Sequence, residues 1–336
     1  MLETPGEDTP RSREETFTFV ADDGHELFVR RFRWESERPA RGIVHVAHGM
    51  SEHGARYARL AAALNRAGYL VYANDHRGHG QTAKGERDLG FFASSGGFHR
   101  VLRDLEQLVS KEKADHPGLG LVLLGHSMGS YLAQAMMIEH GSQLAGVVLS
   151  GSSGKPNALA LAGRAVARIE RLRLGERGKS KLLDDLSFGS FNRPFQPSRT
   201  KFDWLSRDPD EVDKYVADPR CGFMCTTSLW VDLLDALDEI AKPERQLRIP
   251  KDLPVFVLSG VDDPVGERTK SVRQLVEAYR TAGLRKVTSR FYPGRHEMFN
   301  ETNRDEVEKD VLAWLDGIFP ASASKDEGAA APARES

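Results

Sequence analysis

The stretch Leu121-Val122-Leu123-Leu124-Gly125-His126-Ser127-Met128-Gly129 decides the fold, because an apolar run ends there in the motif G-x-S-x-G. Residues 121–124 predict a short buried strand. Apolar residues then recur at helical spacing from Tyr131 to Ile138, and Gly141 is a helix stop. A serine hydroxyl becomes an effective nucleophile when a tight turn between a strand and a helix holds it out toward a base.

Two glycines flank this serine for reasons of packing. Side chains at Gly125 and Gly129 would collide as the strand and the helix pack against each other. The letters alone are weak evidence, since a chain of 336 residues contains such a pentapeptide by chance about one time in ten. The strand, the turn and the helix around Ser127 supply the context that the motif requires.

The order of residues along the chain selects the base. Enzymes with this turn place Asp or Glu and then His after the serine. His140 and His296 are the two histidines that follow Ser127. His140 ends the helix that Ser127 begins, so it is predicted as a cationic residue near a helix C-terminus. His296 lies in a loop after the strand-like run 287–291 and is the predicted base.

The acid is expected at the end of a strand between these two residues. Residues 254–258 predict that strand, and Asp262 and Asp263 follow it. Adjacent side chains point in different directions, so one of the two reaches the imidazole. We favour Asp263 because Pro264 fixes the turn behind it, and Asp262 stays the alternative; the other carboxylate would cap a turn. Asp263 would then orient His296, which moves the serine proton to the leaving group.

Two backbone N–H groups are predicted to stabilise the oxyanion that forms on the substrate. Met128 follows the nucleophile and supplies one of them. Met50 supplies the other, in the loop after the predicted strand 43–47. Gly49 beside it lets the backbone approach the substrate closely.

Five histidines crowd the N-terminal third, and metal binding is the alternative weighed for them. Their spacings match no helical pair of the H-E-x-x-H kind, and Asn300 stands where His296-Glu297 would need a second histidine. Loop hydrogen bonding is therefore the prediction, with residues 75–80 forming a buried polar turn beneath the site. The five are His45, His48, His53, His76 and His79.

Together, these motifs resemble the monoacylglycerol lipase and lysophospholipase family of α/β-hydrolases. The resemblance runs from about Phe17 to Leu315. It implies a carboxylic-ester hydrolase with an apolar acyl pocket beneath a lid, and Met50 and Met128 as oxyanion donors. The motifs are His48-Gly49-Met50-Ser51-Glu52-His53 with Arg56-Tyr57, Asp75-His76-Arg77-Gly78-His79-Gly80, Gly125-His126-Ser127-Met128-Gly129 and Arg295-His296-Glu297-Met298.

Two further segments bear on this resemblance. Asp203-Trp204-Leu205-Ser206, with Tyr215 and Asp218-Pro219, looks like the lid of bacterial members. Gln81-Thr82 departs from the family, which usually has a serine after the second glycine of the DHRGHG turn. The departure leaves the catalytic interpretation intact.

Strands and helices alternate along most of the chain, which favours an α/β fold with a mostly parallel central sheet flanked by helices. The hydrolase core is predicted at 16–151 and 251–320, with a flexible N-terminus at 1–15 and a disordered tail at 321–336. Residues 152–250 break the alternation and predict a helical cap inserted after the sixth strand, over the carboxyl ends of the strands. Strands are predicted at 16–20, 25–33, 43–47, 69–73, 121–124, 144–150, 254–258 and 287–291, and further helices near 57–67, 97–113, 269–282 and 305–319.

One predicted cap helix has an apolar face formed by Leu159, Ala162, Val166, Ile169 and Leu172. Four arginines, Arg164, Arg168, Arg171 and Arg173, lie mostly elsewhere on it. The favoured hypothesis is that the apolar face covers an acyl tunnel and the arginines are solvated; the alternative is contact with an anionic membrane. Six cap aromatics predict either an acyl pocket or the core of the cap, namely Trp204, Trp230, Phe188, Phe191, Phe195 and Phe202.

The amino-acid composition and net charge exclude several classes of function. A hydrophobic content of 40% is ordinary for a globular protein, and a net charge of −2 gives no reason to expect nucleic-acid binding. No apolar run approaches the roughly 18 residues of a membrane span, and Met1 to Glu15 lacks the pattern of a secretory signal. Cys221 and Cys225 are too few for a disulfide framework or a zinc site, and predict free thiols in the cytoplasm.

The leading hypothesis is a serine hydrolase that cleaves an apolar carboxylic ester such as a monoacylglycerol or a lysophospholipid. Water would resolve the acyl-enzyme, so neither a cofactor nor a metal is expected. An amidase, a peptidase or a small-ester esterase on the same triad is the alternative. A non-catalytic ligand-binding scaffold is less favoured, because it should lack a triad residue and none is missing.

Overall fold

The computed structural model of the protein describes residues 12–34 and 39–320, without the side chains of Trp34, Ala158 and Leu159. Residues 1–11 and the predicted tail at 321–336 lie outside this description. The prediction of a flexible N-terminus is wrong for residues 12–15, which begin β1 (Ser12–Val20). Cross-strand ion pairs explain the order there, since Glu15 lies beside Arg31 and Arg33 of β2 (Glu26–Trp34).

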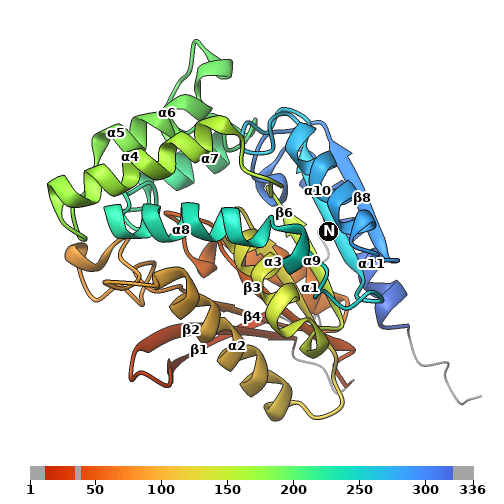
Figure 1. Ribbon diagram of the computed structural model, residues 1–336. Helices are drawn as coiled ribbons and strands as arrows, with labels where there is room; N and C mark the ends of the chain where they lie inside the picture. Colours follow the sequence, from red (N-terminus) through yellow and green to blue (C-terminus); the bar gives the residue numbers. More distant parts are fainter. Residues whose placement is uncertain (1–11, 35–38, 321–336) are drawn as a thin grey trace, which may run out of the picture.

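Within the described residues, eight strands form one sheet in the order β1-β2-β4-β3-β5-β6-β7-β8 (Figure 1). β2 is antiparallel to β1 and to β4, and all other neighbours are parallel. The mostly parallel α/β-hydrolase sheet predicted from the sequence is therefore confirmed. The remaining strands are β3 (Gly42–Ala47), β4 (Tyr69–Asn74), β5 (Leu121–His126), β6 (Gly146–Ser150), β7 (Val255–Gly260) and β8 (Val287–Tyr292).

Helices cover both faces of the sheet, because the central strands are nearly continuous apolar runs that bury side chains on both sides. In β5, Leu121 and Leu123 pack into one core and Val122 and Leu124 into the other. The first core contains apolar residues of α2 (Gly97–Asp115), α3 (Met128–His140) and α10 (Lys270–Thr281). The second contains those of α1 (Ala58–Arg66) and α11 (Arg304–Ile318).

The parallel register brings four loops to one edge of the sheet. Ala47 at the end of β3 lies opposite Gly125 of β5, and His126 lies opposite Ser150 at the end of β6. Gly260 at the end of β7 lies opposite Tyr292 at the end of β8. The loops after β3, β5, β7 and β8 therefore emerge side by side, at the edge where parallel sheets place their sites.

The segment between β6 and β7 is helical, as predicted for a cap, but one of its helices belongs to the core. α8 contacts α2 and α3, and its Leu229 and Leu233 are buried with the apolar residues of those helices (Figure 1). In the described chain none of the helices is both long and apolar enough to cross a bilayer. The helices of this segment are α4 (Ala158–Leu174), α5 (Lys181–Leu186), α6 (Phe188–Phe191), α7 (Pro209–Ala217), α8 (Thr227–Ile240) and α9 (Pro243–Gln246).

The favoured interpretation of α4 is wrong in part. Val166 faces the interior, whereas Ile169 is 61% exposed and Leu172 is 88% exposed. The arginines are not simply solvated, because Arg164 and Arg168 pair with acidic residues of α8. These ion pairs turn the arginine side of α4 toward α8 and leave apolar side chains outside. The side chain of Leu159 lies outside the described part of the chain.

Candidate active site

Ser127 occupies a strained turn between β5 and α3. Its φ of 50° and ψ of −119° lie in a region that residues other than glycine rarely adopt. A β carbon at Gly125 would come within 2.4 Å of the Gly129 carbonyl oxygen, and one at Gly129 within 2.0 Å of the Ala47 carbonyl oxygen. The predicted clash between strand and helix is therefore confirmed for Gly125, whereas a side chain at Gly129 would meet the end of β3. His140 ends α3, at the opposite end from Ser127.

The loops after β7 and β8 bring Asp263 and His296 together. His296 Nδ1 lies 2.9 Å from Asp263 Oδ1, and both side chains are buried. Asp262 is exposed, so Asp263 is the aspartate of this turn that meets the imidazole. His296 Nε2 is buried and has no hydrogen-bond partner in the described part of the chain. The ring therefore has one nitrogen fixed and the other available.

His296 lies next to the serine turn. The rings of His296 and His126, the residue before Ser127, have centroids 4.8 Å apart. Gly151, after β6, leaves room for both rings, since a β carbon there would come within 2.8 Å of His296 and 2.9 Å of His126. Trp204 of the cap covers the imidazole of His296 from another side, with a centroid separation of 4.9 Å.

Two neighbouring imidazoles thus differ in their tendency to take up a proton. Burial lowers the pKa of His296, but the charge and the hydrogen bond of Asp263 outweigh burial and raise it above the usual histidine value. Burial and the nearby His296 lower the pKa of His126 to about 3. His126 is therefore neutral near pH 7, and His296 is the ring that can accept a proton in this range.

The loop after β3 passes directly beside the serine. A β carbon at Gly49 would come within 3.2 Å of Ser127 Cβ, so a side chain there would crowd the nucleophile turn. Glu52 holds this loop by accepting a hydrogen bond of 2.5 Å from the Gly49 N–H. Met50 and Met128 line one cavity with Ser127. Met128 is the first residue of α3, so its N–H has no acceptor within the helix.

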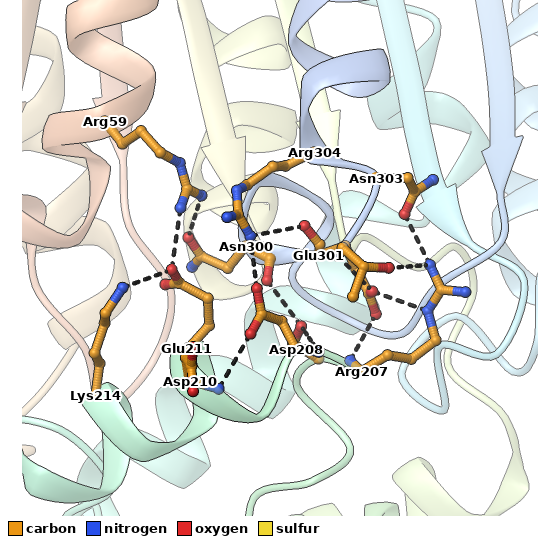
Figure 2. A network of polar contacts seen from close by, with 12 residues as sticks. Arg59, Arg207, Asp208, Asp210, Glu211, Lys214, Asn300, Glu301, Asn303 and Arg304 are labelled. Atoms are coloured by element: carbon orange, nitrogen blue, oxygen red, sulfur yellow. Dashed lines mark hydrogen bonds and ion pairs between the residues drawn. The ribbon is translucent and has the colours of Figure 1, made fainter.

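The loop that carries His296 is held by the cap. The Glu297 N–H donates to the Leu205 carbonyl oxygen over 2.8 Å, and the His296 N–H donates to that of Trp204 over 3.4 Å. The segment 203–206, which resembles a lid, therefore pairs with the histidine loop through its backbone. A polar network continues this contact, with Arg207 beside Glu301, Arg304 beside Asp208 and Arg59 beside Glu211 (Figure 2).

The turn at residues 75–80 is buried and polar, as predicted. Asp75 accepts hydrogen bonds from Arg30, from the Gly54 N–H and from the Gln81 N–H, over 2.7 to 2.9 Å. Thr82 donates to the Asp75 carbonyl oxygen over 2.7 Å, so the departure at Gln81-Thr82 has a structural role.

His48, His76 and His79 are hydrogen-bonded within buried loops, which confirms the prediction for them; His45 is also hydrogen-bonded, but it lies in β3 and not in a loop. His53 instead reaches the cap, where its Nε2 lies 2.8 Å from Asp218. The partners of the others are Glu112 and Asn74 for His45, the Gly49 carbonyl oxygen and the His76 N–H for His48, Asn74 for His76, and the Arg77 carbonyl oxygen for His79.

A cavity of about 330 Å³ lies beside Ser127, between the core and the cap. This volume is within the range of small-molecule sites. Most of its lining is apolar, and α4, α5, α6 and α8 supply much of it. The aromatic residues serve both predicted purposes: Trp204, Trp230, Phe188 and Phe191 line the cavity, and Phe195 and Phe202 pack in the core of the cap.

Comparison with known proteins places these features in a family. Residues 38–303 match the profile of a family described as serine aminopeptidase, S33. A monoacylglycerol lipase of Mycolicibacterium smegmatis is 31% identical over 291 residues, which cover 84% of this chain and 90% of that protein. The chain belongs to the monoacylglycerol lipase family of α/β-hydrolases.

Two further comparisons agree with this membership. Human monoglyceride lipase is 32% identical over 253 residues, covering 73% of this chain and 76% of that protein. A solved carboxyl esterase of Bacillus coagulans superposes with a TM-score of 0.84 at 28% identity, over 91% of this chain and 99% of that one. As a member of the monoacylglycerol lipase family, the chain is a carboxylic-ester hydrolase.

Sequence reasoning assigns no role to a buried ion cluster that this family member contains. Arg56 donates to Glu52 over 2.6 Å and to both carboxylate oxygens of Glu297 over 2.6 and 2.7 Å. Burial alone would raise the pKa of Glu297, but the charge of Arg56 lowers it to about 2. Arg56 therefore joins the loop of Met50 to the loop of His296. Glu52 and Arg56 belong to the H-G-x-x-E-H…R-Y motif, and this motif was the sequence feature that could have predicted the cluster.

Proposed function

We propose that this protein hydrolyses apolar carboxylic monoesters, of the monoacylglycerol or lysophospholipid kind, through a Ser127-His296-Asp263 triad and an acyl-enzyme. The observation that carries the proposal is the buried His296, with Asp263 on Nδ1 and an unpartnered Nε2, beside a serine in a strained turn. A histidine fixed at one nitrogen by a carboxylate and free at the other is what a serine nucleophile needs.

The reaction has two halves that use the same groups. In the first, His296 Nε2 removes the proton of Ser127 Oγ as Oγ attacks the ester carbonyl carbon, and the proton then goes to the departing alcohol. In the second, His296 takes a proton from the water that attacks the acyl-enzyme, and returns it to Ser127 Oγ as the acyl bond breaks and the fatty acid leaves. Asp263 keeps Nε2 free of a proton in the resting state and stabilises the imidazolium that forms.

The negative charge on the substrate oxygen is assigned to the N–H groups of Met50 and Met128. Both residues line the cavity at Ser127, and the Gly49–Glu52 hydrogen bond holds the loop that carries Met50. Backbone donors fixed in advance act without reorganisation, and one such donor contributes a factor of about 10² to 10³ in rate.

The cavity supports an apolar acyl chain as the substrate group. Leu233, Leu234 and Val166 line it together with the cap aromatics, so burial of methylene groups would contribute about 0.8 kcal/mol for each. The names of the human and mycobacterial relatives agree with a monoacylglycerol substrate.

Contact with a lipid surface is a second part of the proposal. Leu161, Ile169 and Leu172 on α4 are 44%, 61% and 88% exposed, and Leu182 and Leu186 on α5 are also exposed. An apolar patch of this kind on a water-exposed helix marks an interaction surface. Because Arg164 and Arg168 already pair with α8, the contact would rest on apolar insertion rather than on anionic lipid.

A fluorophosphonate label followed by a substrate panel tests the proposal. The label should react with the wild type and with Ser110→Ala, a variant at an exposed serine, and should fail with Ser127→Ala. p-Nitrophenyl esters of rising chain length, run beside aminoacyl anilides, then separate an esterase for long chains from an amidase, a peptidase or a small-ester esterase. Labelling that survives in Ser127→Ala would overturn the proposal, and so would a folded wild type that never reacts.

A further inference from the structure

A second group of chemically active side chains lies between the cap and the loop that carries Met50. His53 comes from that loop, and Asp218 and Cys221 come from the cap after α7. One ligand atom of each, namely a histidine nitrogen, a carboxylate oxygen and the cysteine Sγ, lies within 4.8 Å of the other two. The proposed hydrolysis uses none of these three side chains.

The backbone brings the two cap residues together in one turn. The Cys221 N–H donates to the Asp218 carbonyl oxygen over 3.0 Å, and the Arg220 N–H donates to Asp218 Oδ1 over 2.8 Å. The other carboxylate oxygen, Oδ2, lies 2.8 Å from His53 Nε2. One oxygen therefore holds the turn, and the other faces His53.

Two hydrogen bonds hold this turn against the core. The Gly222 N–H and the Tyr215 hydroxyl both donate to the Ser51 carbonyl oxygen, each over 2.9 Å. Ser51 lies between Met50 and His53 in sequence, so the three candidate ligands rest on a backbone that is already fixed. A preorganised set of ligands binds an ion with little loss of conformational entropy.

The surrounding charges favour a cation. Charged groups near Cys221 include the guanidinium of Arg56 and the carboxylates of Asp218, Glu52 and Glu297. These four groups carry three negative charges and one positive charge, an excess that a divalent ion would compensate. The cluster is buried or half-buried, where such charges are weakly screened.

We propose that His53, Asp218 and Cys221 bind a zinc ion, with water as the fourth ligand. Nitrogen, oxygen and sulfur donors together suit Zn²⁺, whereas Mg²⁺ and Ca²⁺ prefer oxygen alone. Tetrahedral Zn²⁺ with bonds of about 2.0 to 2.3 Å sets its ligands roughly 3.4 to 3.7 Å apart. The three atoms lie within 4.8 Å of one another and His53 Nε2 lies 2.8 Å from Asp218 Oδ2, so the side chains must move to reach this spacing.

Binding requires two proton shifts. The Cys221 thiol releases its proton to solvent as the Zn–S bond forms, and the His53 proton moves to Nδ1, which has no partner in the described part of the chain. Because the thiol must lose its proton for the Zn–S bond to form, protons compete with the ion and affinity falls as the pH falls. The bound ion would tie the cap turn to the loop of Met50 and so restrict the movement of both.

Cobalt is the probe for the test, because a thiolate ligand gives Co²⁺ a charge-transfer absorption. The untagged full-length chain, freed of metal with a chelator, is titrated with Co²⁺ and then with Zn²⁺. Wild type should show the thiolate absorption at one equivalent, and Zn²⁺ should abolish it. Cys225→Ser, a change in the other cysteine, should behave like the wild type, whereas Cys221→Ser should lose the band.

Asp218→Asn provides the second variant, because it removes a charge and keeps the shape of the side chain. It should weaken binding by about a hundredfold. Thermal melting without metal confirms that each variant is folded. Absence of the thiolate band in the folded wild type would overturn the proposal, and so would its survival in Cys221→Ser. The readout is independent of ester hydrolysis, so a failed zinc site and a failed triad are distinguishable.

Discussion

The guanidinium of Arg56 meets the carboxylate of Glu297, a residue 241 positions further along the chain. Removing the guanidinium leaves the Glu52 and Glu297 carboxylates buried without a counter-charge. Arg56→Ala should therefore lower the free energy of unfolding by about 3 to 5 kcal/mol, measured by urea denaturation. Adding Glu52→Gln and Glu297→Gln to it should recover part of this loss. A loss below about 1 kcal/mol in the single variant would show that the cluster is not a structural tie.

The aspartate pair is the sharpest test of the proposed triad. Asp263→Asn should lower kcat by about 10⁴-fold, because the imidazole loses the partner that sets its tautomer. Asp262→Asn is the matched control, and its exposed side chain should change kcat by no more than about twofold. Steady-state kinetics on one p-nitrophenyl ester measures both. If the Asp262 change were the severe one, the acid would have been assigned to the wrong residue.

The pH profile should report His296. The proposed base works only when its imidazole is neutral, and Asp263 raises its pKa above the usual value. Activity, measured as kcat/KM against pH, should therefore rise with one proton dissociation at a pH above that of an ordinary histidine and then level off. Asp263→Asn removes the carboxylate charge that raises the pKa of His296. The rise in the residual kcat/KM should therefore move to lower pH. If the rise stayed at the same pH in this variant, it would report the ionisation of another group.

Gly129 has no room for a side chain. Gly129→Ala would place a β carbon 2.0 Å from the Ala47 carbonyl oxygen, so the strand before the Met50 loop or the helix after Ser127 must shift. We expect a loss of several kcal/mol in stability together with a loss of activity, measured by thermal melting and ester hydrolysis. Gly317→Ala in α11 is the control, because nothing lies within 4 Å of that position, and it should stabilise slightly.

The exposed face of α4 should contribute to vesicle binding. Full burial of one such side chain is worth about 1.5 to 3 kcal/mol, so Ile169→Asp with Leu172→Asp should weaken association by at least about tenfold. Val20→Asp, at an exposed apolar residue of the β1 hairpin, should have no effect. Flotation with neutral and with anionic liposomes measures the binding. Failure of the wild type to associate with either kind would end the membrane part of the proposal.

The sequence predicted most of the fold because its signals were local. Short apolar runs such as residues 121–124 located the central strands, and Gly125 and Gly129 located the turn at Ser127. The preference for Asp263 over Asp262 rested on Pro264, and the buried carboxylate in the structure is indeed that of Asp263.

The features that sequence reasoning missed depend on contacts between distant segments. The apolar face of α4 was misjudged because its orientation is set by Asp235 and Asp238 on α8, more than 60 residues away. The same holds for Arg56 with Glu297, and for His53 with Cys221. No periodicity within one segment reports which partner the fold brings beside it.

The position of α8 divides the substrate compartment into two parts with different mechanical properties. Trp230 and Leu233 line the cavity, and the same helix is packed on α2 and α3 beneath it. That wall is thus as stiff as the central domain, and displacing it would break the protein's main hydrophobic interior. Widening of the chamber to admit a bulkier ester must therefore come from its other walls, among them α4, α5 and α6.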